Sequence, residues 1–172
     1  MGLIIKDKIA QLKKGYPTVS DKYNVQGGVY EGDDALYFGD ILVYGSATGH
    51  YLVADNNDVE EIAGICLATN VKLANRYPGD SNSKVETLKG EAFNLLVRGF
   101  VAVAIAVDAA GDTPTAEEIA ATAALCKEGA PVYFDGTMFT ADDAAAQVPG
   151  VYFMGVTEVV EGQLLAEINY KM

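Results

Sequence analysis

The clearest pattern of apolar and polar positions runs from Phe93 to Val107. Every second residue of this stretch is bulky and apolar apart from Gly99, and the residues between them are mixed at first and then mostly alanine. A period of two is typical of a β-strand whose two faces differ. Fifteen residues exceed the usual strand length, so Gly99 is predicted to mark a bend or bulge at a barrel corner. The alanines would let another segment pack closely on their face.

Shorter apolar runs predict further strands. Residues 41–44, 51–54 and 62–68 are separated by glycine-rich or polar turns, which is typical of consecutive strands. Residues 153–160 and 163–170 flank Glu161-Gly162 and predict a hairpin. The body is therefore expected to be mainly β.

Two stretches carry helical signals. Thr115 followed by Glu118 is a capping box that opens an alanine-rich run, and it predicts a helix over 115–127. A weaker amphipathic pattern over residues 3–13 is followed by a proline and several glycines. We therefore expect residues 1–35 to form an extended N-terminal arm that lies on the surface or against a partner.

Residues 36–172 are predicted to form one compact β-barrel or β-sandwich body with one short helix, and two parts of it share a pattern. Three landmarks recur at offsets of 90, 87 and 91 residues, pairing Gly39 with Gly129, Asp55 with Asp142, and Gly64 with Gly155. We interpret this as a duplicated β unit over 39–68 and 129–160, with the helix at 115–127 inserted between the copies.

The charge is strongly acidic and unevenly distributed. The net charge of −12 argues against nucleic-acid binding, which needs a basic stripe. Residues 1–22 nevertheless sum to +3, so the remainder carries −15. This polarity is suited to docking, although lysines in a solvated tail explain it equally well. The lysines of this segment are the first candidate contacts, namely Lys6, Lys8, Lys13, Lys14 and Lys22.

Tyrosines add a second set of candidates. Tyr16, Tyr23 and Tyr30 are spaced by seven residues within the predicted arm. Tyrosine offers a large contact area with a polar tip, which favours a role in binding a partner. The alternative is coincidental spacing combined with packing in the protein's own core.

Recognisable reaction chemistry is scarce. His50 is the one histidine and lies in a predicted turn without a nucleophile beside it in sequence. The acidic pair Asp142-Asp143 is typical of a solvated turn, although a structural cation held by loop acids stays open. Cys66 and Cys126 sit among apolar neighbours and are interpreted as core residues. We predict no enzyme, no cofactor and no metal.

The sequence has no apolar run of 18 residues, so we expect no contact with a membrane. Its start does not match a secretory signal, which favours synthesis in a reducing cytoplasm.

These motifs together resemble a known family. Their order is Gly39-Asp40-Ile41-Leu42-Val43-Tyr44-Gly45, then Ile62-Ala63-Gly64-Ile65-Cys66-Leu67-Ala68, Val97-Arg98-Gly99-Phe100-Val101 and Gly129-Ala130-Pro131-Val132-Tyr133. The pattern over about residues 25–170 is similar to the capsid cement, or decoration, proteins of tailed bacteriophages. The resemblance implies a structural protein that binds the major capsid protein on the outside of the phage head, as a homotrimer and without enzymatic activity. The sequence departs from the family's usual form at residues 109–128, where the capped helix is inserted, and in the apolar, lysine-bearing residues 3–13.

Three alternatives stay open at this point. One is another virion component, such as a head fibre base, a tail tube or a minor head protein. The others are a small β-rich enzyme that uses acidic pairs such as Asp142-Asp143, and a barrel that binds a small ligand.

Overall fold

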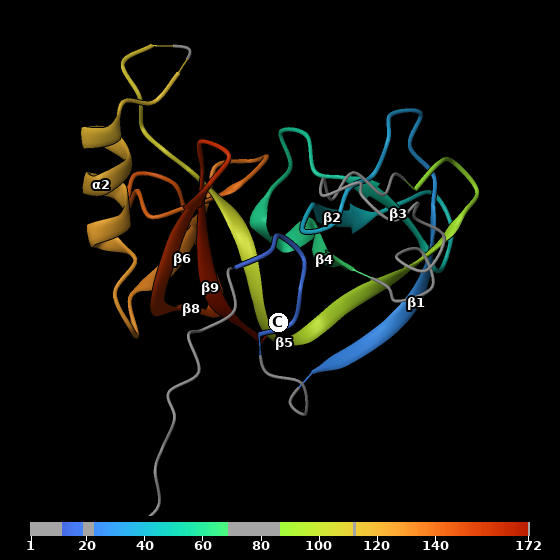
Figure 1. The fold of residues 1–172 in the computed structure, drawn as a ribbon. Helices are drawn as coiled ribbons and strands as arrows, with labels where there is room; N and C mark the ends of the chain where they lie inside the picture. Colours follow the sequence, from blue (N-terminus) through green and yellow to red (C-terminus); the bar gives the residue numbers. More distant parts are fainter. Residues whose placement is uncertain (1–11, 19–22, 69–86, 112, 172) are drawn as a thin grey trace, which may run out of the picture.

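The computed structural model describes residues 12–18, 23–68, 87–111 and 113–171. About half of them lie in strands, with one α-helix and one short 3-10 helix among them (Figure 1). In chain order the elements are β1 Asn24–Tyr30, β2 Ile41–Tyr44, β3 His50–Val53, η1 Val59–Glu61, β4 Ile62–Leu67, β5 Ala92–Ala106, α2 Ala116–Leu125, β6 Pro131–Phe134, β7 Phe139–Thr140, β8 Ala146–Val160 and β9 Gln163–Lys171. The prediction of a mainly β chain is confirmed.

The strands close into two five-stranded rings that share β5. The first ring runs β1-β3-β2-β4-β5 and closes through the antiparallel β1–β5 pairing. The second runs β5-β7-β6-β8-β9 and closes through the antiparallel β5–β9 pairing. Figure 1 shows the rings side by side, with β5 passing from one to the other. Of the two predicted architectures, the structure is therefore a barrel.

The long strand β5 bends at the predicted glycine. Residues up to Arg98 pair with β1 and β4, and residues from Arg98 onward pair with β9 and, near the end, with β7. Gly99 has a φ of 147°, a value that residues with a side chain rarely adopt. The bend lets one strand serve both rings.

The two rings have the same pairing pattern. In the first ring β2 pairs antiparallel with β3, and β1 pairs parallel with β3. In the second ring β6 pairs antiparallel with β7, and β5 pairs parallel with β7. Thus β2 corresponds to β6 and β3 to β7. Gly39 and Gly129 both have a φ of 80°. Each donates its N–H to the fourth strand of its ring, to the carbonyl of Cys66 on β4 at 2.7 Å and of Phe153 on β8 at 2.9 Å.

The third landmark of the repeat differs from its expected position. Ile41 pairs with Ile65, whereas the corresponding Pro131 pairs with Tyr152. The counterpart of Gly64 is thus Val151, and Gly155 instead lies where the β8–β9 register shifts between Phe153 and Thr157. A bulge in β8 displaces the glycine, and no local signal in the sequence indicates it.

Residues 24–30 correct the expected N-terminal arm. They form β1, which pairs with β3 and β5 inside the first ring. The glycines that suggested a loop have a packing role, because a Cβ at Gly28 would lie 2.7 Å from the Tyr51 side chain and 2.8 Å from that of Phe93. These two aromatic side chains meet edge to face at 5.8 Å, so the strand passes close above them.

The alanine face of β5 is covered as predicted. Leu12 is 4% exposed and forms a small core cluster with Ala102, Ala104 and Leu165. Leu12 belongs to the segment 12–18, which therefore packs on the body. The expected helix over residues 3–13 otherwise lies outside the described residues.

The predicted helix and its cap are confirmed. The side chain of Thr115 accepts from the backbone N–H of Glu118, and the Glu118 carboxylate accepts from the N–H of Thr115 at 2.7 Å. The helix α2 occupies the connection between β5 and β6, where the first ring has only a loop between β1 and β2. Ile119 and Ala123 of α2 pack against the main core.

Candidate docking surface

The structure anchors part of the predicted binding segment to the body. The N–H of Gly15 donates to the Ala102 carbonyl at 2.8 Å, and the N–H of Ala68 donates to the Gly15 carbonyl at 2.9 Å. The N–H of Leu12 donates to the carboxylate of Glu158 at 2.6 Å. Residues 12–18 thus contact β5, the end of β4 and β8, and they cross the junction of the rings.

Residues 12–18 pass close to the backbone around Gly39 because both segments have a glycine at the point of contact. Gly15 has a φ of 74°, and a Cβ there would lie 2.4 Å from the backbone nitrogen of Gly39. A Cβ at Gly39 would in turn lie 2.5 Å from the side chain of Lys14. Neither position accommodates a side chain without movement of its neighbours.

The predicted contact residues fall into different environments. Lys13 is exposed and lies over the Tyr16 ring at 5.7 Å, and the Tyr16 ring meets Phe38 edge to face. Lys14 forms an ion pair with Asp40 at 2.8 Å. The remaining lysine candidates, Lys6, Lys8 and Lys22, lie outside the described residues.

The three tyrosines do not form one surface. Tyr30 is only 2% exposed and lies in the core cluster of the first ring, where burial is the main cause that raises its pKa. The interpretation of Tyr30 as a partner contact is therefore corrected to a core residue, which was the alternative stated for this set. Tyr23 is 45% exposed and faces solvent.

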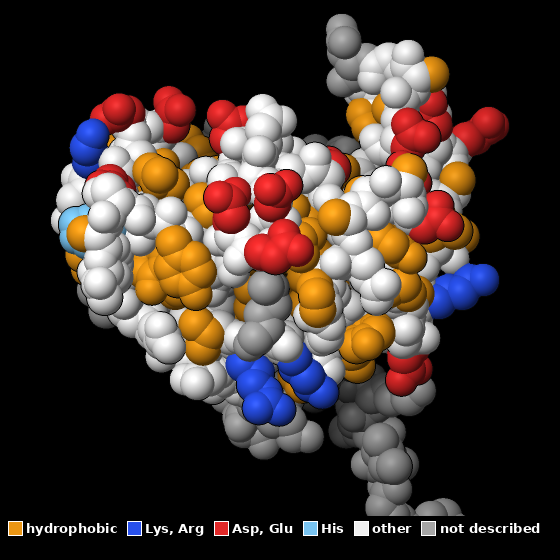
Figure 2. All heavy atoms as spheres, turned by 180° about the vertical axis from the view of Figure 1, so that it is seen from behind, with side chains coloured by type: hydrophobic (Ala, Val, Ile, Leu, Met, Phe, Trp, Pro, Cys, Tyr) orange, Lys and Arg blue, Asp and Glu red, His pale blue; other side chains and the backbone are white. Residues whose placement is uncertain are grey.

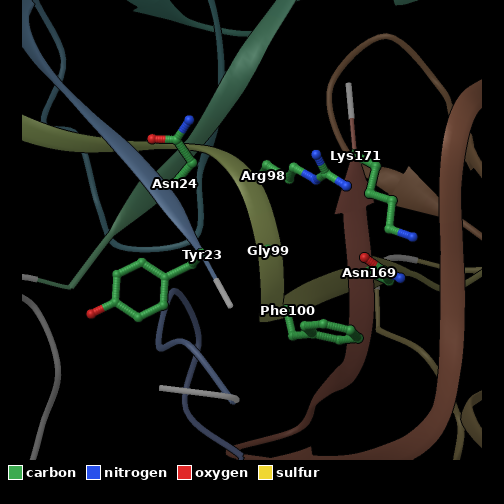
Figure 3. Close-up of a pocket in the computed structure, with 7 residues that line it drawn as sticks. All are labelled: Tyr23, Asn24, Arg98, Gly99, Phe100, Asn169 and Lys171. Atoms are coloured by element: carbon green, nitrogen blue, oxygen red, sulfur yellow. The ribbon is translucent and has the colours of Figure 1, made fainter. Parts of the chain in front are cut away.

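Tyr23 lines a hollow that the sequence did not reveal. The hollow has a volume of about 580 Å³ and lies where β5 bends (Figure 3). Its lining residues come from β1, β5, β9 and the residue before β1, namely Tyr23, Asn24, Arg98, Gly99, Phe100, Asn169 and Lys171. Arg98 and Lys171 make this hollow basic, although the chain carries a net charge of −12.

The polar residues of this hollow form a row across three strands. Arg98 pairs with Asn24 on β1 and with Lys171 on β9, and Figure 3 shows the Arg98 and Lys171 side chains reaching to the same side. Within the described part of the chain neither cation forms an ion pair, in contrast to Lys14 and Lys89. The side-chain oxygen of Asn169, beside them, is buried and has no hydrogen-bond partner among the described residues.

A second hollow of about 490 Å³ adjoins the first and shares Asn24 and Arg98 with it. It is also lined by Glu60 and by three buried residues of the first ring's core cluster, Tyr51, Ala63 and Leu95, and it reaches Tyr44, which is 66% exposed. The two hollows together form a groove whose lining includes the exposed tyrosines Tyr23 and Tyr44, the basic residues Arg98 and Lys171, and the acidic Glu60. We call this surface the junction groove.

Acidic side chains elsewhere are held by local partners. The Ser46 hydroxyl and backbone N–H bind Glu31 and lower its pKa. Lys89 donates to Asp33 at 2.6 Å, which lowers the pKa of Asp33 and raises that of Lys89. Figure 2 shows a group of basic side chains at the lower edge of one face and acidic side chains above it, with further basic side chains lying beside acidic ones at the two sides.

Groups that carry reaction chemistry are dispersed. Cys66 and Cys126 are buried and are not joined in a disulfide, and burial raises the pKa of Cys126 to about 11. Among the residues described by the structure, no three histidine, cysteine or acidic side chains are placed to hold a metal ion. In the same residues no helix has the length and apolar character needed to cross a bilayer.

The comparisons with known proteins agree with this picture. Residues 6–171 match the model of the family described as "Structural cement protein (E217 gp24/Pam3 gp6)". The chain belongs to the phage structural cement protein family. It is thus a structural protein of the bacteriophage virion that associates with capsid proteins.

A solved structure has the same fold as this cement protein. A chain of "The capsid of Myoviridae Phage XM1" superposes with a TM-score of 0.60 at 14% sequence identity, covering 99% of this chain and 97% of that chain. A search of curated proteins found no match. The shared fold with little shared sequence shows that the architecture tolerates wide sequence variation.

Proposed function

We propose that this cement protein binds the outside of a phage head and stabilises the contacts between neighbouring major capsid subunits. The observation that carries the proposal is the family match over nearly the whole chain. Supporting it, the body is a closed barrel with a well-packed core, which gives a rigid support for a docking face. Such a role needs neither catalysis nor a cofactor.

Several finer parts of the proposal come from the sequence. The partners are the major capsid protein and further copies of this chain, which we predict to form a homotrimer. A closed oligomer docks several weak patches at once, so avidity replaces a single strong site. Nucleic acid and membrane are not partners in this proposal, and synthesis takes place in the host cytoplasm before the protein reaches the shell.

The proposal is tested on heads produced with and without this protein. Cryo-electron microscopy is expected to show added density on the outer surface that spans neighbouring capsid subunits. Heads without the protein are expected to lose their DNA at a lower temperature. Equal thermal resistance of both kinds of head, with no difference in external density, would refute the proposal.

The solution mass of the purified protein tests the predicted trimer separately. A second candidate function, that of another virion component, predicts assembly into tubes or binding to the tail instead. The purified protein incubated with isolated heads and isolated tails discriminates between these outcomes.

A further inference from the structure

The junction groove brings two like charges together without compensation. Arg98 and Lys171 are directly opposite each other in the antiparallel β5–β9 ladder. Like charges in this position destabilise a sheet. The chain has 24 acidic residues against 12 basic ones, yet in its described part neither of these two cations has an acidic partner. The arrangement therefore costs stability in the isolated molecule.

The two cations also occupy equivalent positions in the duplicated units. Leu96 pairs with Ile65 in the first ring, and Asn169 pairs with Tyr152 in the second. Arg98 and Lys171 follow two residues later, on β5 and β9 respectively. Arg98 is on β5, the last strand of the first ring, and Lys171 is on β9, the last strand of the second ring. Because β5 also pairs with β9, the two equivalent cations lie side by side.

The groove has the composition of a protein interface. Exposed Tyr23 and Tyr44 line it together with Arg98, and tyrosine and arginine are among the residues that most often dominate binding energy. Glu60 lines only the hollow that reaches Tyr44, so the hollow that holds both Arg98 and Lys171 has no acidic lining residue. Asn169 lines the same hollow and places a further polar side chain beside the two cations. A polypeptide with carboxylates offers anions to the cations and further contact area to the exposed tyrosines, whereas an inorganic anion offers only the charge.

We propose that the junction groove binds an extended acidic segment of the major capsid protein, with carboxylates on Arg98 and Lys171. This inference rests on the proposed function. Charge complementarity supports it, because residues 23–172 carry −15 in total and disfavour acidic segments, whereas the neighbouring Arg98 and Lys171 attract them. The bound segment removes the repulsion that the free protein bears.

The test compares two variants that change the net charge equally. Lys171→Glu reverses one charge of the groove, and Lys127→Glu reverses an exposed lysine just after α2 that forms no ion pair within the described part. Heads lacking the protein are titrated with wild type and with each variant. Lys171→Glu is expected to weaken binding about tenfold or more at low salt and less at high salt, and Lys127→Glu is expected to bind like wild type.

A stability measurement guards against simple misfolding. In Lys171→Glu the new carboxylate would face the Arg98 guanidinium with opposite charge, so the melting temperature of this variant is expected to equal or exceed that of wild type. Loss of head binding together with unchanged or higher stability supports the proposal. Separately, a blocked peptide of alternating glutamate and glycine is expected to shift the NMR signals of the Arg98 guanidinium and the Asn169 amide.

The outcomes separate this inference from the proposed function. Equal head binding by all three proteins would overturn the groove as the docking site and leave the proposed function standing. Equal weakening by both variants would do the same, because net charge would then explain the effect. Loss of self-association in Lys171→Glu with normal head binding would identify a second copy as the occupant and overturn the capsid segment. Failure of wild type to bind heads would refute the proposed function and, with it, the capsid protein as the occupant.

Discussion

Substitution of Gly15 by alanine tests whether residues 12–18 are an integral part of the folded body. The backbone of Gly15 has a φ of 74°, where a Cβ costs about 1–2 kcal/mol. The new methyl would also lie 2.4 Å from the nitrogen of Gly39 and 2.7 Å from the carbonyl carbon of Phe38. Both contacts are with backbone, so rotation of a neighbouring side chain cannot relieve them.

The expected loss in the free energy of unfolding can be worked out from the hydrogen bonds that the new methyl would lengthen. Moving the segment away lengthens the hydrogen bonds that join Gly15 to Ala102 and Ala68, and each contributes about 0.5–1.5 kcal/mol. Together with the strained φ, the expected loss in the free energy of unfolding is about 3 kcal/mol. For a chain of this length that corresponds to a fall in melting temperature of roughly 6–12 °C.

The assay combines thermal unfolding with amide hydrogen exchange. The amides of Gly15, Ala68 and Ala102 are expected to exchange faster in the variant, because their hydrogen bonds hold the crossing together. Gly27→Ala is the matched control, since a Cβ at Gly27 meets no atom within 4 Å. The control is expected to stay within about 1 kcal/mol of wild type.

A clear result would refute this reasoning. If Gly15→Ala melts no lower than Gly27→Ala and the three amides keep their protection, residues 12–18 do not cross Gly39 as described. In that case deletion of residues 1–24 would leave the body as stable as the full chain. The described contacts of Leu12 instead predict that this deletion lowers stability as well as head binding.

Three further predictions concern individual side chains. Burial raises the pKa of the Cys126 thiol to about 11, so at about pH 8 it is neutral and is expected to react with Ellman's reagent only after unfolding; stoichiometric reaction of the native protein would contradict this. The N–H of Thr115 is the main cause that lowers the pKa of Glu118 below its ordinary 4.5, so its contribution to stability is present above pH 4.5 and is lost as the pH falls through the lower, folded value. Glu118→Gln should therefore reduce the fall of melting temperature between about pH 5 and pH 3, and an unchanged fall would argue against the cap. Replacing Lys13 and Lys14 by glutamate is expected to weaken head binding more at low than at high salt, whereas a salt-independent loss would point to misfolding.

The sequence predicted those features that are encoded locally. The alternation over 93–107, the bend at Gly99 and the capping box at Thr115 all appear where a short window of residues determines them. The repeat was detected at Gly39 and Gly129 because both positions need the same positive φ. These features depend on residues that are close in sequence, so the sequence alone is enough to predict them.

Other features depend on residues that are distant in sequence. The glycines of β1 looked like a loop because the side chains that pack on Gly28 come from Tyr51 and Phe93. Likewise, Arg98 and Lys171 are ordinary residues of two strands until the shared strand places them side by side. Alignment of the two units on β5 and β9, not only on their glycines, would have pointed to this pair.

The sharing of β5 has a mechanical consequence. When two barrels each have five strands of their own, one cut in the connecting loop separates two complete barrels. Here β5 belongs to both rings, so no single cut in the chain yields two complete barrels. A load pulling the rings apart is therefore borne along a continuous covalent backbone rather than across a seam of weak contacts.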